Sequence, residues 1–405
     1  MHPTIIFYFL CGVSWLYICS YIILMISATR TGRSTVPLSH RHGPCAPVPS
    51  KERSLSERLR HDVARAGYVH QATGGYGYGL QRSDPAPTLL GDALGSEEYV
   101  VTVGIGSPAF GHTLILDTGS HVSWVRCNTQ FGTPFDPSAS SSYAPFSCSA
   151  PTCAHLGGQW NGCSQDQCQY TVSYQDGSYT AGTYASDTLT LTGSEAITGF
   201  QFGCSHTDNV DARIDGLLGL GGGFSYCLPP SPRSSGFLTL GAPADESAFT
   251  MTRLLRKAGS ETFYVVLLQA ISVDGKQLDV PPSVFSAGSV LDSGTVITRL
   301  PTAAYTALSS AFKAGMTEYP PGPPNGILDT CFNLTGKINV TLPCVALVFD
   351  GGAVLELDAD GIVDNGCLAF AATDDTSIVG NVQQRTFEVL HDVARGVAGF
   401  RAGAC

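Results

Sequence analysis

Charged side chains are scarce in this 405-residue sequence, and positive charge is scarcer than negative. Asp, Glu, Lys and Arg make up 14% of the residues, and the formal net charge is -11. Beyond residue 95, thirteen Lys and Arg face twenty-eight Asp and Glu, a net charge of -15. Binding to a phosphate backbone needs clustered cations. The composition therefore excludes nucleic acid as a partner.

Metal-binding cysteine motifs are absent as well. The fourteen cysteines never occur as CxxC, and even the closest are spaced too widely for a zinc ribbon. A scattered set of this kind is typical of disulfides formed in an oxidising compartment. We therefore expect no metal site and no other cofactor. Eleven cysteines lie between Cys127 and Cys405, so one is left over if the others pair, and we expect it to be Cys344.

The motif Gly-x-Ser-x-Gly, which forms the nucleophile elbow of many serine hydrolases, does not occur anywhere in the chain. Ser, His and Asp are all present, but nothing in their order points to a nucleophilic serine. The absence of the Gly-x-Ser-x-Gly motif argues against a serine hydrolase.

The first residues lack charge over an unusual length. No charged residue occurs from Ile5 to Ile26, which is roughly the length that spans a bilayer and also fits a long signal peptide. Ser27 and Ala28 are small enough to mark a cleavage site, although no Lys or Arg precedes the apolar run. We interpret residues 1–29 as a signal peptide or a membrane anchor, and either one sends the rest of the chain across a membrane.

Residues 30–95 differ from the rest of the chain in composition. Pro, Arg, His, Ser and Gly dominate, and residues 1–95 hold nine Lys and Arg against five Asp and Glu, a net charge of +4. A single stretch, Ser54 to Ala66, is compatible with a helix and contains Arg58, Arg60 and Arg65. The segment fits a removable propeptide and also fits a solvated linker.

From about residue 96 the pattern becomes one short strand after another. Val, Ile, Thr, Tyr and Phe recur in alternating runs separated by turn residues, which is typical of a mostly β protein. One helix is expected over Thr302 to Ala314, with Thr302 as its N-cap. The length allows two lobes, which we place at residues 96–250 and 251–405. The expected strands are Tyr99 to Ile105, Thr113 to Leu116, Tyr170 to Tyr174, Thr183 to Leu191, Phe237 to Leu240, Tyr264 to Ile271, Val345 to Phe349, Cys367 to Ala371 and Phe387 to His391.

An internal repeat supports the two lobes. Each half contains an apolar strand that ends in Asp, a hydroxyl residue, Gly and a second hydroxyl residue. A hydrophobic pair followed by Gly occurs later in each half, as Leu217-Leu218-Gly219 and Ile378-Val379-Gly380. The two matched settings make a chance turn a poor explanation. The repeated motifs are Asp117-Thr118-Gly119-Ser120 and Asp292-Ser293-Gly294-Thr295.

Two aspartates from matched halves can perform acid-base chemistry without a metal. Carboxyl groups within hydrogen-bond reach share one proton, so that one acts as a base and the other as an acid. Asp117 and Asp292 could then activate a water molecule and protonate the oxyanion of a peptide carbonyl. Gly119 and Gly294 would let the two loops approach each other. The neighbouring hydroxyls would orient the aspartates, and they belong to Thr118, Ser120, Ser293 and Thr295.

On these motifs the chain resembles the pepsin-like aspartic peptidases, within them the cysteine-rich plant branch typified by nepenthesin. The resemblance runs from about Val36 to Cys405. Further segments that carry it are Val36 to Pro44, Phe202-Gly203-Cys204, Asp215 to Leu220, Phe224 to Leu228 and Gly380 to Arg385.

The resemblance implies a bilobed, mostly β fold with two pseudo-twofold-related lobes and a cleft between them. It implies an aspartic-type endopeptidase that is active in acid, acts on polypeptides and is made as a zymogen with its own propeptide. A hairpin flap would carry Tyr174, and Trp124 would hydrogen-bond to the Tyr174 hydroxyl. Departures from the family pattern are Gln175, His121, a short link from Gly219 to Phe224 and a short insert after Cys127.

Several further expectations accompany this reading. The protein would be a monomer in the secretory pathway, in the apoplast, outside the cell or in the vacuole, and it would be membrane-bound only if residues 5–26 are retained. Asn333 and Asn339 each begin a glycosylation sequon. The basic leader would be held on the acidic body by charge attraction and released in acid. The alternative is a non-catalytic inhibitor or binding protein of the same fold.

Overall fold

The computed structural model describes most of the chain from Ser34 onwards. The described residues are 34–40, 55–73, 99–118, 120, 122–127, 134–174, 178–192, 195–210, 214–220, 223–230, 235–241, 246–255, 263–337 and 339–404. No helix among them is long and apolar enough to cross a bilayer. The expected signal peptide or anchor, the flap turn at Gln175, His121 and parts of the two short segments, residues 128–133 and 221–222, lie outside these ranges.

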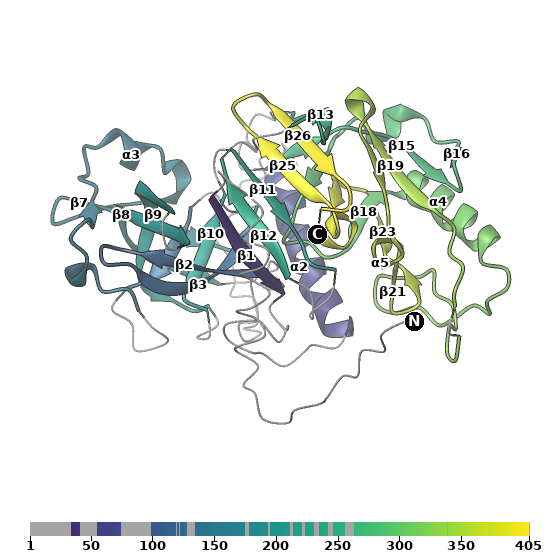
Figure 1. The fold of residues 1–405 in the computed structure, drawn as a ribbon, viewed down its shortest axis with the longest axis horizontal. Helices are drawn as coiled ribbons and strands as arrows, with labels where there is room; N and C mark the ends of the chain where they lie inside the picture. The colour runs from purple at the N-terminus through teal and green to yellow at the C-terminus, as the bar shows by residue number, and fades with distance from the viewer. Residues whose placement is uncertain are drawn as a thin grey trace, which may run out of the picture.

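The first lobe is built from antiparallel strands with two parallel pairs, β3 with β10 and β4 with β9 (Figure 1, left). Buried residues alternate with more exposed ones along β7, which explains why this segment forms a strand with one face on the core. The elements are β2 (Tyr99–Ile105), β3 (Phe110–Asp117), β4 (Trp124–Arg126), β5 (Ala144–Pro145), α3 (Pro151–Ala154), β6 (Trp160–Ser164), β7 (Gln167–Ser173), β8 (Tyr179–Thr192), β9 (Glu195–Asp208) and β10 (Gly216–Gly219).

A set of strands in the middle of the molecule joins the two halves (Figure 1). The order is β13, β26, β25, β11, β12, β1 and β2, so strands from both ends of the chain belong to one sheet, with β11 and β12 between them. The additional strands are β1 (Ser34–His40), β11 (Gly223–Cys227), β12 (Ser235–Leu240), β13 (Thr250–Arg253), β25 (Glu388–Asp392) and β26 (Val397–Arg401).

The second lobe contains the remaining sheets and three of the described helices (Figure 1, right). Its strands are β14 (Val265–Val266), β15 (Leu268–Val273), β16 (Lys276–Gln277), β17 (Ser289–Leu291), β18 (Thr298–Pro301), β19 (Val345–Phe349), β20 (Val354–Glu356), β21 (Val363–Asp364), β22 (Cys367–Leu368), β23 (Phe370–Thr373) and β24 (Ser377–Val379). Its helices are α4 (Thr302–Gly315), α5 (Ala359–Ile362) and α6 (Asn381–Gln384). The mostly β, bilobed fold class is confirmed.

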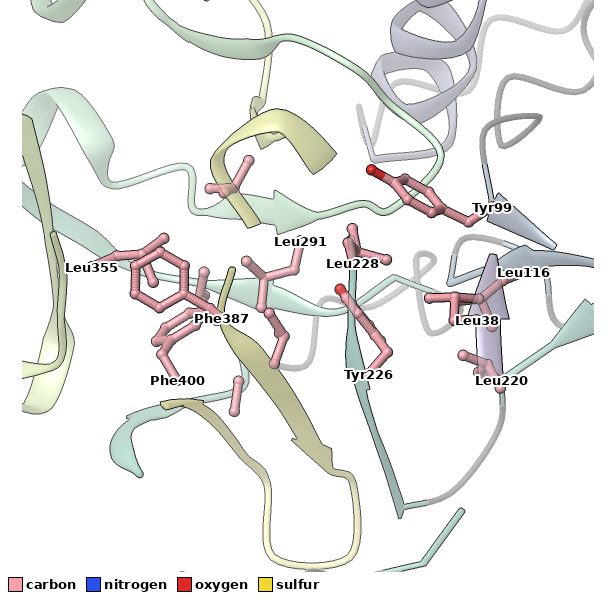
Figure 2. Packing of buried hydrophobic residues seen from close by; sticks show 14 of the residues in the cluster. Leu38, Tyr99, Leu116, Leu220, Tyr226, Leu228, Leu291, Leu355, Phe387 and Phe400 are labelled. Atoms are coloured by element: carbon pink, nitrogen blue, oxygen red, sulfur yellow. The ribbon is translucent and has the colours of Figure 1, made fainter. Parts of the chain in front are cut away.

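The hydrophobic core is continuous through the middle sheet. Tyr226 and Leu228, at the end of β11, lie between Leu291 and Phe387 of the second lobe and Leu38 of the leader (Figure 2). All five side chains are buried. Because one cluster joins the leader strand β1 to both lobes, the three parts pack as one body.

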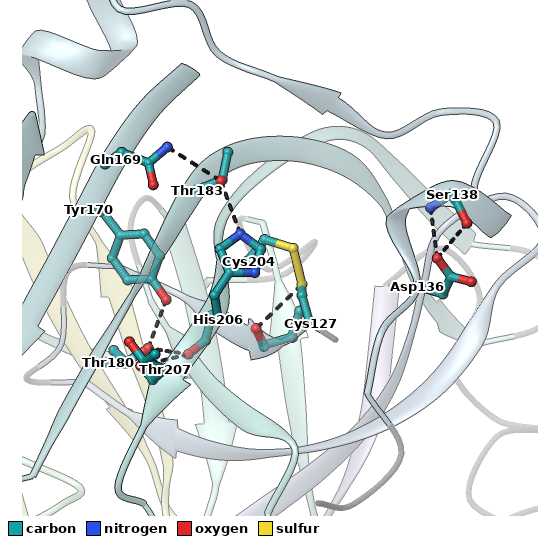
Figure 3. Close-up of a disulfide and its surroundings, with 12 residues drawn as sticks. Cys127, Asp136, Ser138, Gln169, Tyr170, Thr180, Thr183, Cys204, His206 and Thr207 are labelled. Carbon is teal, nitrogen blue, oxygen red and sulfur yellow. Dashed lines mark hydrogen bonds between the residues drawn. A yellow bond between two sulfur atoms is a disulfide. The ribbon is translucent and has the colours of Figure 1, made fainter. Parts of the chain in front are cut away.

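Four disulfides are present among the described residues: Cys127–Cys204, Cys148–Cys163, Cys153–Cys168 and Cys331–Cys367. The first joins β4 to β9, close to the Tyr170–Thr180 hydrogen bond of 2.8 Å (Figure 3). Cys344 is free and exposed, which confirms its prediction as the unpaired cysteine.

Two sequence predictions about helices need correction. The helix expected over Ser54 to Ala66 is α2, Leu55–Thr73, about two turns longer than predicted. Thr302 is not the N-cap of α4 but its first residue, and Pro301 takes the cap position without a side-chain hydrogen bond. The Thr302 hydroxyl instead donates to Asp374 at 2.6 Å. A tertiary hydrogen bond has therefore replaced the local capping bond.

Candidate active site

Each of the two aspartates lies at the end of a strand that pairs in parallel with a second strand. Asp117 is the last residue of β3 and lies opposite Gly219 of β10. Asp292 follows β17 directly, and its N–H donates to the Val379 carbonyl of β24 at 3.1 Å. Both side chains are at most 1% exposed. The repeat seen in the sequence thus corresponds to the same local structure in each lobe.

Hydroxyl residues join the two loops across the boundary between the lobes. The Ser293 N–H donates to Thr118 Oγ1 at 3.0 Å, and the Thr118 N–H donates to Ser293 Oγ at 3.4 Å. The two hydroxyls are themselves 3.2 Å apart. These reciprocal bonds hold the backbones of both loops at a fixed separation, so the carboxylates next to them are held as well.

A second pair of hydroxyls orients the carboxylates. Ser120 Oγ donates to Asp117 Oδ2 at 2.5 Å, and Thr295 Oγ1 donates to Asp292 Oδ2 at 2.6 Å. The Gly294 N–H adds a bond to Asp292 Oδ1 at 3.1 Å. Gly119, which was predicted to let the two loops approach each other, lies outside the described part of the chain.

The structure also places a residue at the site that the sequence reading did not assign to it. Arg65 of α2 lies between the aspartates, with Nη2 at 2.9 Å from Asp117 Oδ1 and 2.8 Å from Asp292 Oδ1. Its Nε donates to Asp292 Oδ2 at 2.9 Å. The Arg65 side chain is 5% exposed. A Cβ at Gly294 would lie 3.2 Å from this guanidinium, so the glycine leaves room for it.

One turn before Arg65, α2 makes a second buried contact. The Asp62 carboxylate accepts hydrogen bonds from the backbone N–H groups of Val296 and Ile297. Its Oδ2 lies 2.6 Å from Nη2 of Arg299 on β18. Val296 and Ile297 are the fourth and fifth residues after Asp292. Helix α2 is therefore attached both to the aspartates and to the chain that follows the second one.

The buried carboxyl groups differ in their pKa. Burial raises the pKa of Asp292, but the Arg65 charge and hydrogen bonds outweigh it, so that the pKa lies below its usual value. Burial raises the pKa of Asp62 to about 6, although the Arg299 charge and the two backbone hydrogen bonds lower it. The difference arises because Asp292 receives a bidentate cation, whereas Asp62 has a single cation contact.

The aromatic residues predicted for the flap also come together. Trp124 Nε1 donates to the Tyr174 hydroxyl at 3.0 Å, the contact that the resemblance implied. Burial raises the pKa of Tyr174 far above its usual value, so the hydroxyl stays protonated. Tyr174 follows the end of β7, and its backbone N–H donates to the Ser178 carbonyl at 2.8 Å. The two predicted glycosylation residues, Asn333 and Asn339, are exposed.

Among the described residues, one group has the spacing of a metal site: Cys148, Cys163 and Asp166. The two cysteines form a disulfide, so their sulfur atoms are not available as thiolate ligands. This group does not fit a metal ion.

The involvement of α2 left a weak signal in the sequence. Leu59, Asp62, Ala66 and Val69 recur at helical spacing and are all buried. Arg65 lies on the same side. A charged pair placed inside an apolar stripe indicates a docked helix with buried ionic partners, whereas a solvated basic helix would keep its charges off that stripe.

Comparison with known proteins agrees with this architecture. Residues 99–223 and 263–402 match the family models described as xylanase inhibitor N-terminal and C-terminal. An aspartyl protease family protein of Arabidopsis thaliana is 38% identical to this chain, and the alignment covers 93% of this chain and 88% of the Arabidopsis protein. Aspartic proteinase nepenthesin-2 of Nepenthes gracilis is 31% identical to this chain, and the alignment covers 79% of this chain and 80% of the nepenthesin.

Solved structures agree on the fold. The crystal structure of basic 7S globulin from soybean is similar with a TM-score of 0.59 and 18% identity, covering 75% of this chain and 90% of that one. The crystal structure of edgp is similar with a TM-score of 0.63 and 20% identity over 77% of this chain and 93% of that one. At this identity the likeness supports the fold alone.

Proposed function

This chain belongs to the plant branch of the pepsin-like aspartyl protease family, and we propose that it is an aspartic endopeptidase. The observation that carries the proposal is the convergence of Asp117 and Asp292 on a single guanidinium nitrogen of Arg65. Two carboxylates that reach one atom from opposite lobes also reach one water molecule. Polypeptides are the proposed substrates, since the hydrolysed bond is a peptide bond.

The proposed chemistry starts once Arg65 has left the site. Without the cation, two carboxylates this close cannot both stay ionised at low cost, and they share a proton. The ionised member takes a proton from water as the water attacks the peptide carbonyl, and the protonated member gives its proton to the carbonyl oxygen. The Ser120 and Thr295 hydroxyls keep each carboxylate oriented during the transfer.

The same geometry supports synthesis as an inactive precursor. Helix α2 belongs to residues 30–95, the proposed propeptide, and Arg65 occupies the place where water and substrate would bind. Residues 96–250 and 251–405 are then the two catalytic lobes of a monomer. We place the protein in the secretory pathway, with glycans on the exposed Asn333 and Asn339.

Cleavage of an unfolded protein at acid pH, with and without a statine-type inhibitor that mimics the transition state, tests the proposal. We expect cleavage to require acid conversion of the precursor and to stop with the inhibitor. Conversion of the precursor without any inhibitor-sensitive cleavage would contradict it. Such a result would favour the non-catalytic inhibitor alternative, which we do not favour since both aspartates are present with their hydroxyl partners.

A further inference from the structure

The Asp62 carboxylate occupies a receptor made almost wholly by the second lobe. Two backbone N–H groups, from Val296 and Ile297, donate to Oδ1, and the Arg299 guanidinium donates to Oδ2 at 2.6 Å. Asp62 is 1% exposed and Arg299 is 6% exposed. Backbone N–H donors and a guanidinium both form charge-assisted hydrogen bonds with a carboxylate. The receptor therefore recognises a chemical group and not only a helix.

If α2 is removed, the receptor stays with the second lobe and its occupant, Asp62, leaves with the helix. Val296, Ile297 and Arg299 belong to the lobe that carries Asp292, whereas Asp62 belongs to the leader. Without Asp62, Arg299 loses the only carboxylate that contacts it among the described residues. Its Nε is already buried without a hydrogen-bond partner. A buried guanidinium and two N–H donors without an acceptor are costly, so the site favours another anion.

The receptor lies within reach of a bound substrate. Asp62 precedes Arg65 by three residues on one helix, which is about 4.5 Å along the axis. An extended peptide advances about 3.3 Å per residue. A peptide whose scissile bond replaces the Arg65 guanidinium therefore carries a side chain to this receptor from a position within about three residues of that bond.

We propose that Arg299, with the N–H groups of Val296 and Ile297, is a substrate subsite that selects an Asp or Glu side chain near the scissile bond. This inference rests on the proposed function, and it names the class of substrate. Leader Asp62 then mimics the acidic residue of a substrate while Arg65 blocks the aspartates. The surroundings are apolar, because Leu59 packs against Val296 and Ile297, and this strengthens a charge-assisted hydrogen bond.

Cleavage of matched peptides tests the subsite. Quenched fluorescent peptides with Asp, Asn or Ala at each of the three positions on either side of one bond are given to the acid-activated protein at pH 6, because burial raises the pKa of a carboxyl docked in this receptor to about 6 and a lower pH would protonate it. At one position we expect kcat/KM to be about tenfold higher for Asp than for Asn, the effect of one charge-assisted hydrogen bond. In Arg299→Gln the Asp-to-Asn ratio should fall to about one, and Arg299→Lys should retain part of it.

The matched control is Arg253→Gln, which removes an exposed arginine whose partner is Asp350. It should keep the wild-type ratio. A ratio near one in the wild-type protein at every position overturns the proposal, and so does an Asp preference that Arg299→Gln leaves unchanged.

Failure of the proposed function is a separate outcome, seen as no cleavage of any peptide. The subsite is then tested by binding alone, with a synthetic Leu55–Thr73 peptide and its Asp62→Asn form added to protein that an added protease has cut on both sides of α2, so that β1 stays in the sheet. A dissociation constant about tenfold weaker for the Asn peptide supports the receptor. Equal affinity overturns it.

Discussion

Ser120 and Thr295 each hydrogen-bond to the aspartate three residues before them, and this sets how much of each carboxylate is free. Each bond engages Oδ2, while Oδ1 faces Arg65 Nη2. Oδ2 of Asp292 also accepts a hydrogen bond from Arg65 Nε. Because Thr118 and Ser293 fix the backbones, the side chains have little freedom to turn away from each other. Such preorganisation is what acid-base catalysis requires.

Asp117→Asn or Asp292→Asn should lower kcat/KM at acid pH by about a thousandfold or more, since each amide removes one half of a proton-sharing pair. The amide nearly keeps the volume, so the thermal midpoint should change little. Peptide cleavage and thermal unfolding of the purified variants measure both. Glu318→Gln, an exposed acid-to-amide change, is the control. Substantial activity in either aspartate variant would disprove the assignment.

Asn333 and Asn339 are exposed and stand in sequons, so both are accessible to glycan transfer in a secretory pathway. Protein made in a eukaryotic secretory host should lose mass when treated with an N-glycosidase. Asn333→Gln and Asn339→Gln should each remove one part of that shift. An unchanged mass in the wild-type protein would reject occupancy of both positions.

Helix α2 shows how the arginines of one element differ in their contacts. Arg65 contacts both aspartates, Arg58 forms an ion pair of 3.3 Å with Asp364, and Arg60 is exposed with a bond to its own helix. Arg53 lies outside the described residues. Buried contacts are worth far more than exposed ones. Among the arginines of α2, Arg65 therefore contributes most to holding the leader on the two lobes, and the contributions of Arg58 and Arg60 are smaller.

Arg65→Gln in the precursor should weaken docking of α2 and shift acid conversion to higher pH, because it removes the cation that both carboxylates contact. Arg60→Gln is the matched control and should convert like the wild type, since its side chain is exposed. Gel analysis of precursor conversion against pH measures both. If the two variants convert alike, the helix is held by packing and not by the Arg65 contacts.

The strands were predictable from sequence because their signal is local. Val345 to Phe349 was predicted residue for residue, and Tyr99 to Ile105 likewise, since alternation and flanking turns define them. The strand β1 in the leader was not predicted. Its pairing with β12 and β2 depends on residues far away in the chain, and its own sequence contains Pro37.

The aspartates of the site were predictable from the repeat, but the cation between them was not. The two motifs resemble each other, and this internal repeat can be detected in the sequence without knowing the fold. Arg65 has no counterpart in the other half, and a basic helix is normally solvated. Its place follows from tertiary packing of Leu59, Ala66 and Val69 against the second lobe.

At the scale of the whole molecule, the leader contributes to both the sheet and the site. Strand β1 lies between β12 and β2, and its residues Val36 and Leu38 are fully buried. Helix α2 covers the two aspartates and contacts both through Arg65. Attraction between a +4 leader and a -15 body is a weaker explanation than these contacts, since exposed charges are screened by salt. The response of the precursor to acid therefore depends on a few buried carboxyl groups.

Asp292 and Asp62 make docking of α2 depend on pH with opposite signs. The docked pKa of Asp292 is lowered by Arg65 against the effect of burial, so its contribution to docking is present above the ordinary carboxyl range and is lost as pH falls through it. Burial raises the docked pKa of Asp62 to about 6, against Arg299 and with the Asp292 charge adding to the rise. Its contribution therefore grows as pH falls from about 6 towards 4.

Hydrogen exchange along α2 measures this balance in an intact precursor that carries His70→Gln, since burial lowers the pKa of His70 on the same helix and its protonation would oppose docking in the same pH range. From pH 7 to pH 5 we expect the protection factors, corrected for the intrinsic exchange rate, to rise about tenfold, because the docked Asp62 takes up a proton that the free one does not. Below about pH 4 protection should fall, since the free aspartates bind a proton that Arg65 excludes. In Asp62→Asn the rise should disappear while the fall remains. Protection that decreases steadily from pH 7 in the precursor that keeps Asp62 would mean that Asp62 does not oppose release, and that the aspartates alone set its pH.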